Sequence, residues 1–199
     1  MQGASRHLLR CTAAVVLMIV LAAPAASQQW SGFQANATHQ SFLDVDALNS
    51  DQQEFFSVDV GRPIKTAPVV SNGKVFFADD SGGLYAYTTS GSKIWEDSRS
   101  SSVGEGITVA DGRLFVPYGT EGFYIYNAST GDVLKSLGTN TDDSFLAPPA
   151  VYRDTVVFGE SSFASFDSTG PNLTVYNVTS DTTRTITADS SLGGAPAIR

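Results

Sequence analysis

The sequence has 199 residues, an ordinary length for one domain or two. Hydrophobic residues make up 42% of the chain and charged residues 16%, so it can bury a core and a disordered protein is excluded. The formal net charge of -8 argues against a nucleic-acid partner, which needs a basic face, and against electrostatic docking on anionic lipid. The composition therefore predicts an acidic globular protein.

The first 27 residues are typical of a secretory signal peptide. Arg6 and Arg10 form a positive n-region, TAAVVLMIVLAA is the apolar h-region, and APA or AAS then offers small residues for cleavage. The alternative is an uncleaved leader that anchors the chain, although the apolar run is shorter than the roughly 20 residues of a full span. We predict an exported protein, at the cell surface, in the periplasm or in the medium, that contacts a membrane only through an uncleaved leader.

Cys11, the only cysteine, lies before the h-region. After cleavage the chain would have no cysteine, and therefore no disulfide, thiolate nucleophile or cysteine-type metal site. The exported fold would depend on its core and its hydrogen bonds alone.

Two stretches of the chain repeat one pattern. APVVSNGKVFFADDSGGLYAYTTSGSKIWE starts at Ala67 and GITVADGRLFVPYGTEGFYIYNASTGDVLK starts at Gly106. We align them without a gap at an offset of 39 residues, which matches Tyr87 with Tyr126. A third copy, with an insertion around SSFASFDSTGPN, begins with APPAVYRDTVVFGE, and a fourth begins with GAPAIR.

Each copy predicts short strands joined by tight turns. In the first copy the strands are APVV, KVFFA, LYAYT and KIWE, and the turns are SNG, DDSGG and TSGS. A four-stranded unit repeated every ~40 residues is typical of a β-propeller blade, whose sheet must stack on another blade to bury both faces. The predicted fold is an all-β propeller of four-stranded antiparallel blades.

The predicted organisation follows the repeats. Closed propellers have about four to eight blades, so the roughly three blades here predict a partial ring. Either the chain is a fragment or truncated product of a longer propeller, or it is a short form that closes by self-association. The predicted segments are a signal peptide at 1–27, an N-terminal segment with the lone outer strand EFFSVDVG at 28–65, blades at about 66–98, 106–138 and 147–188, and the start of a further blade at 194–199.

The stretch DSGGLYAYTTSGSKIW resembles the PQQ-like (quinoprotein-type) propeller repeat, in which D-G-x-L-Y-A-x-D is followed by T-G-x-x-x-W. QWSGFQANATHQSF is also similar to the opening of such proteins. The family includes quinoprotein dehydrogenases, the BamB-type scaffold of outer-membrane assembly and many uncharacterised exported proteins. The resemblance implies that Trp95 packs between neighbouring blades. We assign structural blade packing to Trp95, Tyr85, Tyr87, Tyr124 and Tyr126.

The later copies depart from this pattern. The second copy has Lys135 at the place of Trp95, and the third has Thr185 there. The third copy also has Asp181 where the first two have glycine. We therefore expect later contacts between blades to be weaker or differently built.

The resemblance also implies what a quinone site would need. Quinoprotein dehydrogenases hold the quinone on the axis of a complete ring, with a Trp floor, calcium ligands, a catalytic Asp and often a vicinal cysteine pair. This chain has no vicinal cysteine pair, and no dehydrogenase residue carries over to it. Trp30 is expected to anchor the N-terminal segment. We expect no cofactor, with PQQ and calcium arising only if the chain is part of an oxidoreductase.

No motif indicates a metal or catalytic site. The acidic runs at 44–46, 79–80 and 141–143 lack the D-x-[DN]-x-[DN]-G spacing of a calcium loop, and a turn favours Asp at 79–80. His39 is the only histidine outside the leader, and G-x-S-x-G is absent, so His39 is expected to be structural. The sequence thus indicates no catalytic, cofactor-binding or metal residue.

Four N-x-[ST] sequons could carry glycans in an exported protein. Asn127 and Asn177 each follow a strand tyrosine, where an Asn side chain that bonds its own backbone would suit the turn without any sugar. The four candidate asparagines are Asn36, Asn127, Asn172 and Asn177.

Two functions remain open. The first is a non-enzymatic binding or scaffold module for a protein or polymer partner, without nucleic acid. The alternative is a fragment of a PQQ-dependent quinoprotein oxidoreductase whose active site lies on other blades, an analogy that rests on fold alone.

Overall fold

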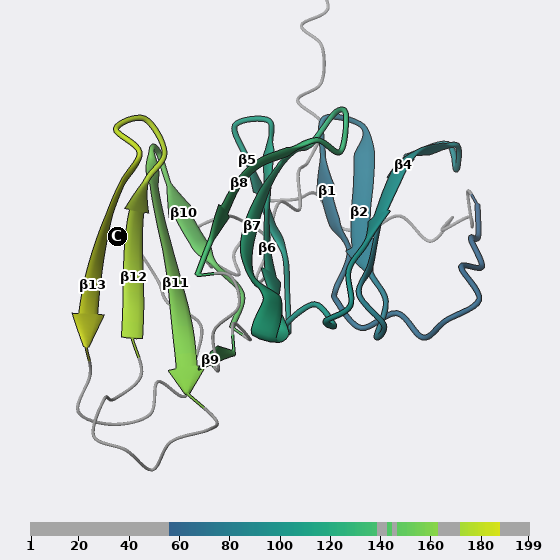
Figure 1. Cartoon of the computed structure of the whole chain (residues 1–199). Helices are drawn as coiled ribbons and strands as arrows, with labels where there is room; N and C mark the ends of the chain where they lie inside the picture. Colours follow the sequence, from purple (N-terminus) through teal and green to yellow (C-terminus); the bar gives the residue numbers. More distant parts are fainter. Residues whose placement is uncertain (1–55, 139–142, 145–146, 163–171, 188–199) are drawn as a thin grey trace, which may run out of the picture.

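The computed structural model describes residues 56–138, 143–144, 147–162 and 172–187. These residues form three antiparallel sheets that stand side by side in chain order (Figure 1), and their only helical element is the short 3-10 turn η2 (Gly119–Glu121). The predicted all-β fold with four-stranded antiparallel blades is confirmed. The predicted leader, Trp30, Asn36, His39 and the start of the fourth copy lie outside the described residues.

Each sheet is one blade, and its strands pair in the order in which they follow along the chain. Blade 1 contains β1 (Val69–Ser71), β2 (Lys74–Ala78), β3 (Gly83–Thr88) and β4 (Lys93–Ser98). Blade 2 contains β5 (Thr108–Ala110), β6 (Arg113–Tyr118), β7 (Gly122–Asn127) and β8 (Val133–Leu137). Blade 3 contains β10 (Ala150–Tyr152), β11 (Thr155–Ser162), β12 (Asn172–Asn177) and β13 (Thr182–Thr187), and the short β9 (Asp143–Ser144) pairs with β11.

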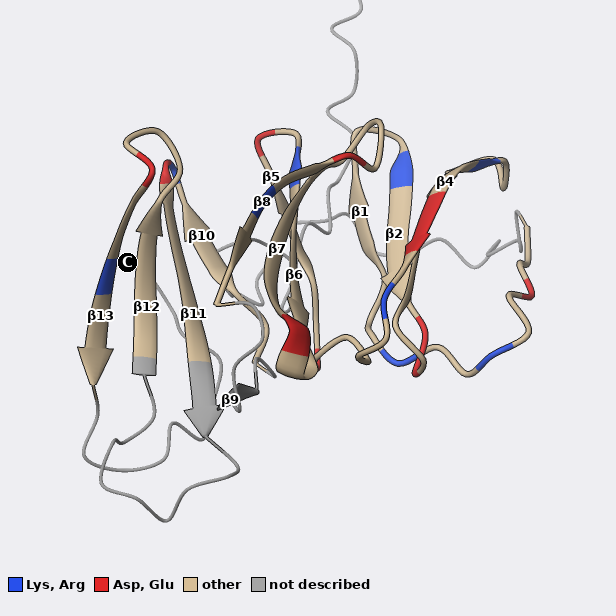
Figure 2. Cartoon of the chain, in the orientation of Figure 1, with Lys and Arg blue, Asp and Glu red and all other residues tan. Residues whose placement is uncertain are grey.

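The first hairpin of every blade turns through a residue in the left-handed region. Asn72, Asp111 and Arg153 have φ of 49°, 47° and 51°, each directly after the first strand of its blade. Asn and Asp tolerate this conformation better than most residues, which explains the SNG and ADG turns. Figure 2 shows that charged residues lie largely in such turns and connections, whereas most of the strand length is uncharged.

Alternate residues of each strand point to opposite faces, so the middle blade contributes to two cores. Leu114 and Val116 of β6 point toward blade 1, and Phe115 between them points toward blade 3. The core between blades 1 and 2 contains Val69, Phe76, Ala78, Leu84, Ala86, Val103, Ile107, Val109, Leu114, Val116, Tyr118, Tyr124, Tyr126 and Ala128. The core between blades 2 and 3 contains Phe115, Phe123, Ile125, Val151, Val156, Phe158 and Tyr176.

The gap-free alignment of the first two copies is wrong beyond Tyr87 and Tyr126. Residues 89–92 join β3 to β4, whereas residues 128–132 join β7 to β8, which is one residue more. The insertion lies in an exposed turn, where an extra residue does not disturb the sheet.

Strand pairing shows which residues occupy the place of Trp95. Trp95 pairs with Ala86, and Lys135 pairs with Ile125 at the same point of blade 2, so their predicted equivalence is confirmed. In blade 3, Arg184 rather than the predicted Thr185 takes this place, opposite Val175. The reason is that β4 and β8 each contain a register shift, which β13 lacks.

Candidate functional site

The junctions between neighbouring blades, here called seams, repeat one contact with different chemistry. At each seam a side chain from the last strand of one blade meets the turn between the third and fourth strands of the next blade. A similar contact precedes blade 1, although the predicted outer strand EFFSVDVG forms no strand over its described residues 56–61. Phe56, which precedes blade 1, lies against Gly91, so that a Cβ on Gly91 would be 2.9 Å from the Phe56 ring. Phe56 stands eight residues before the bridge residue Ile64, as Trp95 stands eight before the bridge residue Val103.

The first seam, between blades 1 and 2, is closed by Trp95. Its ring stacks on Tyr126 with centroids 6.3 Å apart and lies 6.0 Å from the ring of Phe76. Its Nε1–H donates to the carbonyl oxygen of Ala128 over 3.2 Å. Gly131 has φ 79°, and a Cβ there would lie 2.8 Å from the indole. Glycine therefore satisfies both the left-handed turn and the close approach of the ring.

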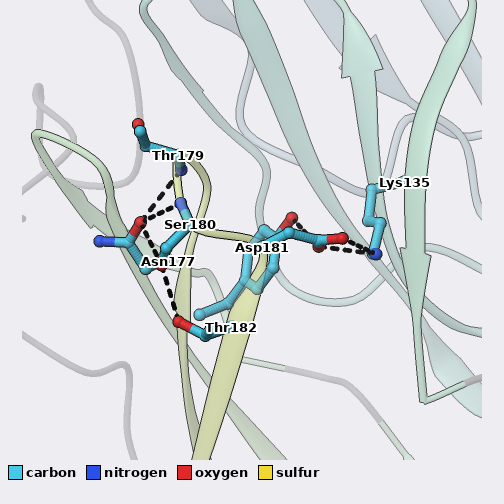
Figure 3. Close-up of polar contacts among 7 residues, drawn as sticks. Lys135, Asn177, Thr179, Ser180, Asp181 and Thr182 are labelled. Carbon is cyan, nitrogen blue, oxygen red and sulfur yellow. Dashed lines mark hydrogen bonds and ion pairs between the residues drawn. The ribbon is translucent and has the colours of Figure 1, made fainter.

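The second seam, between blades 2 and 3, replaces the ring and the glycine with an ion pair (Figure 3). Lys135 Nζ lies 2.7 Å from Asp181 Oδ1, which also accepts a 2.9 Å hydrogen bond from the Tyr176 hydroxyl. Asp181 has φ 53°, so it takes the left-handed turn position of Gly131. The hydrogen bonds from Lys135 and Tyr176 lower the pKa of the Asp181 carboxyl. Lys135 in place of Trp95 and Asp181 in place of glycine, the two departures from the repeat pattern, therefore compensate each other.

A second polar group, the Arg99 cluster, also lies in the first seam and shares Tyr126 with Trp95. The guanidinium carbon of Arg99 is 3.8 Å from the centre of the Tyr124 ring, in cation–π contact. Arg99 Nε donates to the Tyr126 hydroxyl over 2.7 Å, and that hydroxyl donates to Asp97 Oδ2 over 2.8 Å. Arg99 Nη2 also reaches Asp97, at 3.4 Å. The cluster links the segment that follows β4 to strand β7 of blade 2.

The Asp79 carboxylate organises the turn between β2 and β3. Its Oδ1 accepts from the backbone N–H groups of Ser81 and Gly83, at 2.8 and 2.9 Å, and Oδ2 accepts from the Tyr85 hydroxyl at 2.8 Å. Burial raises the pKa of Asp79, but these hydrogen bonds outweigh it and leave the pKa below its ordinary value. Asp79 thus serves the turn. In the part of the chain that the structure describes, no group of three or more His, Cys, Asp or Glu residues could hold a metal ion.

The five residues assigned to blade packing lie on two different faces. Trp95, Tyr124 and Tyr126 belong to the first seam. Tyr85 and Tyr87 instead flank Phe77, with ring centroids 5.4 and 5.7 Å apart, on the face of blade 1 that points away from blade 2.

Two sequon asparagines hold turns. Asn127 Oδ1 accepts from the backbone N–H of Ser129 at 2.8 Å, and Asn177 Oδ1 accepts from that of Ser180 at 2.8 Å. Asn172 lies in β12 and Asn36 outside the described residues. Glycosylation of all four stays a prediction.

Four tyrosines should titrate late in the folded protein, and burial raises the pKa of one of them, Tyr118, well above its ordinary value. Burial, with hydrogen bonding to carboxylates, raises the pKa of Tyr85, Tyr126 and Tyr176 to about 12 each. Because folding favours the neutral phenol, this contribution to stability is complete below pH 10, the ordinary Tyr pKa, and is lost as the pH rises to about 12.

Ultraviolet titration of tyrosinate should therefore show a late phase in the folded chain that disappears in urea. Tyr126→Phe should reduce its amplitude. Titration of every tyrosine near pH 10 in the folded protein would contradict this assignment.

Stacked four-stranded blades with a repeated seam contact define this protein as a β-propeller repeat protein. A family model described as outer membrane protein assembly factor BamB matches residues 19–196. The chain therefore belongs to this PQQ-like repeat family.

Solved structures of propeller proteins are similar to the chain in fold. A quinohemoprotein alcohol dehydrogenase from Pseudomonas putida HK5 aligns with TM-score 0.60 at 18% identity, over 76% of this chain and 25% of its own. A europium-containing methanol dehydrogenase aligns with TM-score 0.68 at 14% identity, over 81% of this chain and 32% of its own. BamB from Moraxella catarrhalis aligns with TM-score 0.52 at 14% identity, over 64% of this chain and 37% of its own.

The chain thus spans about a quarter to a third of the length of the two dehydrogenases. A search of curated proteins found no match. Within the described ranges, no helix has the length and apolar character needed to span a membrane.

Proposed function

We propose that the chain is an exported, non-enzymatic binding or scaffold module that acts on a protein or polymer partner. The observation that carries this proposal is the match of residues 19–196 to the model of an outer membrane assembly factor. The proposed leader at residues 1–27 would deliver the chain to the compartment in which such a factor works.

The polar groups of the described residues support a structural role. Asp79 is 1% exposed and its two oxygens accept bonds from its own turn and from Tyr85. Arg99 is held by Tyr124, Tyr126 and Asp97. These charged groups hold the blades and turns together. We propose that the exposed side of the turns contacts the partner.

Two measurements test the proposal. N-terminal sequencing of the protein secreted with its own leader should find a start after Ala25 or Ser27, and an intact N-terminus in the cytoplasm would contradict export. Crosslinking of the tagged chain in its own envelope, followed by mass spectrometry, should recover a partner in fixed proportion. If the tagged chain is abundant in the envelope but no crosslinked partner is recovered with it, a scaffold role is contradicted.

A second candidate function is that the chain forms part of a PQQ-dependent oxidoreductase. The similarity in fold to the quinohemoprotein alcohol dehydrogenase favours it. Because the active site would lie on other blades, a form that carries those blades would be mixed with PQQ and calcium, desalted and examined for quinone absorbance. The scaffold proposal expects no retained absorbance. Stoichiometric retention that depends on calcium would overturn it in favour of the oxidoreductase.

A further inference from the structure

The face of blade 3 that points away from blade 2 is here called its outer face. Its residue pairs match those on the face of blade 2 that packs against blade 3. In blade 2, Ile125 pairs with Lys135 and Phe123 with Leu137. In blade 3, the same pairs are Val175 with Arg184 and Leu173 with Ile186. Both faces therefore combine an apolar patch on the two outermost strands with one cation at the seam position.

The two faces differ in what covers them. Phe123 and Ile125 are 0% and 1% exposed because blade 3 packs on them. Ile186 is 44% exposed, and Leu173 and Val175 are only partly buried. Arg184 is exposed and has no ion pair with another described residue, and Figure 2 shows β13 with a basic band and no acidic one.

We propose that this face is an interface for a further four-stranded blade whose turn between its third and fourth strands carries a carboxylate opposite Arg184. The second seam gives the rule, because the cation Lys135 there meets Asp181 at the left-handed turn position. An Arg at the same seam position selects a carboxylate by charge and by its planar fork of donors.

The same rule argues against a second copy of this chain as the occupant. In a head-to-tail contact, the turn that faced Arg184 would be that of blade 1, which has Gly91 in place of an acid. That turn is also already covered by Phe56. Arg184 would gain no charged partner there, and the Phe56 contact would have to break.

The test adds a blade of known chemistry to the full chain. A copy of residues 153–187 is fused after Arg199, so that the predicted first strand at 194–199 takes the place of β10 and the copy's own Asp181 supplies the carboxylate. The matched control carries Asp181→Gly in the added copy only, which keeps a residue suited to the left-handed turn. Both versions are also made with Arg184→Gln in the original blade 3. Limited proteolysis of the added copy is the readout.

With Arg184 present, Asp181→Gly in the added copy should speed its proteolysis by about two- to fivefold, as expected for loss of a partly exposed ion pair. With Arg184→Gln, the two versions should be cleaved at equal rates. An equal effect of Asp181→Gly in both backgrounds would overturn the proposal, and so would an added copy that is unprotected in every version. Light scattering of the unextended chain is the third arm, because a dimer abolished by Arg184→Glu would assign the face to a second copy.

Discussion

Replacing Trp95 with alanine should lower the free energy of unfolding by about 3 kcal/mol, the lower end of the range for buried Trp truncations, because the indole is only partly buried. The variant loses the stacking on Tyr126, the contact with Phe76 and the hydrogen bond to Ala128. Urea denaturation followed by circular dichroism measures the change.

Gly131→Ala is the matched partner of this variant. Its Cβ would meet the indole at 2.8 Å and it would also strain a turn with φ 79°. In the Trp95→Ala background the collision disappears and only the strain remains, so the two changes should be strongly non-additive. A loss below about 1 kcal/mol for Trp95→Ala, which is typical of exposed sites, would show that the ring does not close the first seam.

Replacing Phe158 with alanine should cost about 3–5 kcal/mol, because the change leaves a cavity in the core between blades 2 and 3. Phe158 is 1% exposed and stacks on Phe123, with ring centroids 4.0 Å apart and planes 1° apart. Denaturation in urea gives the free energy.

Tyr152→Ala is the control for Phe158→Ala, since Tyr152 belongs to the same blade but is 42% exposed and should cost far less. Phe158→Ala could also unfold in two steps, with blade 3 separating first and the fluorescence of Trp95 changing only in the second step, at the denaturant concentration of the unmodified chain. That result would still place Phe158 in the second seam. Equal losses for the two variants would refute packing of blade 3 on blade 2.

The repeat and its turns could be predicted because they depend on local sequence. Asn72 and Asp111 suit the left-handed turn by their own chemistry, and the nearly continuous apolar runs of β6 and β7 specify strands with two buried faces. Trp95 could be placed through the family resemblance. The extra residue near Gly131 was missed because turns of different length can share the same composition.

The contacts across seams could not be predicted in the same way. Lys135 and Asp181 are 46 residues apart, and their pairing depends on the registers of β8 and β13 together. Arg99 lies in the connection between β4 and β5, where the sequence has no apolar periodicity, so nothing in the sequence pattern indicated its contact with Tyr124. Phe56 did have one, since it precedes Trp95 by the repeat offset of 39 residues.

Trp95 with Gly131 and Lys135 with Asp181 are two chemical versions of one seam contact. The direct test is to exchange one for the other in the second seam, by comparing Lys135→Trp, Asp181→Gly and the double variant in urea denaturation. Lys135→Trp alone should destabilise the fold because its ring meets the Asp181 side chain, and Asp181→Gly alone should do so because it loses the ion pair. The double variant should be more stable than the sum of the single effects predicts by at least about 1 kcal/mol, a coupling expected only for residues in contact. Strictly additive effects would contradict it.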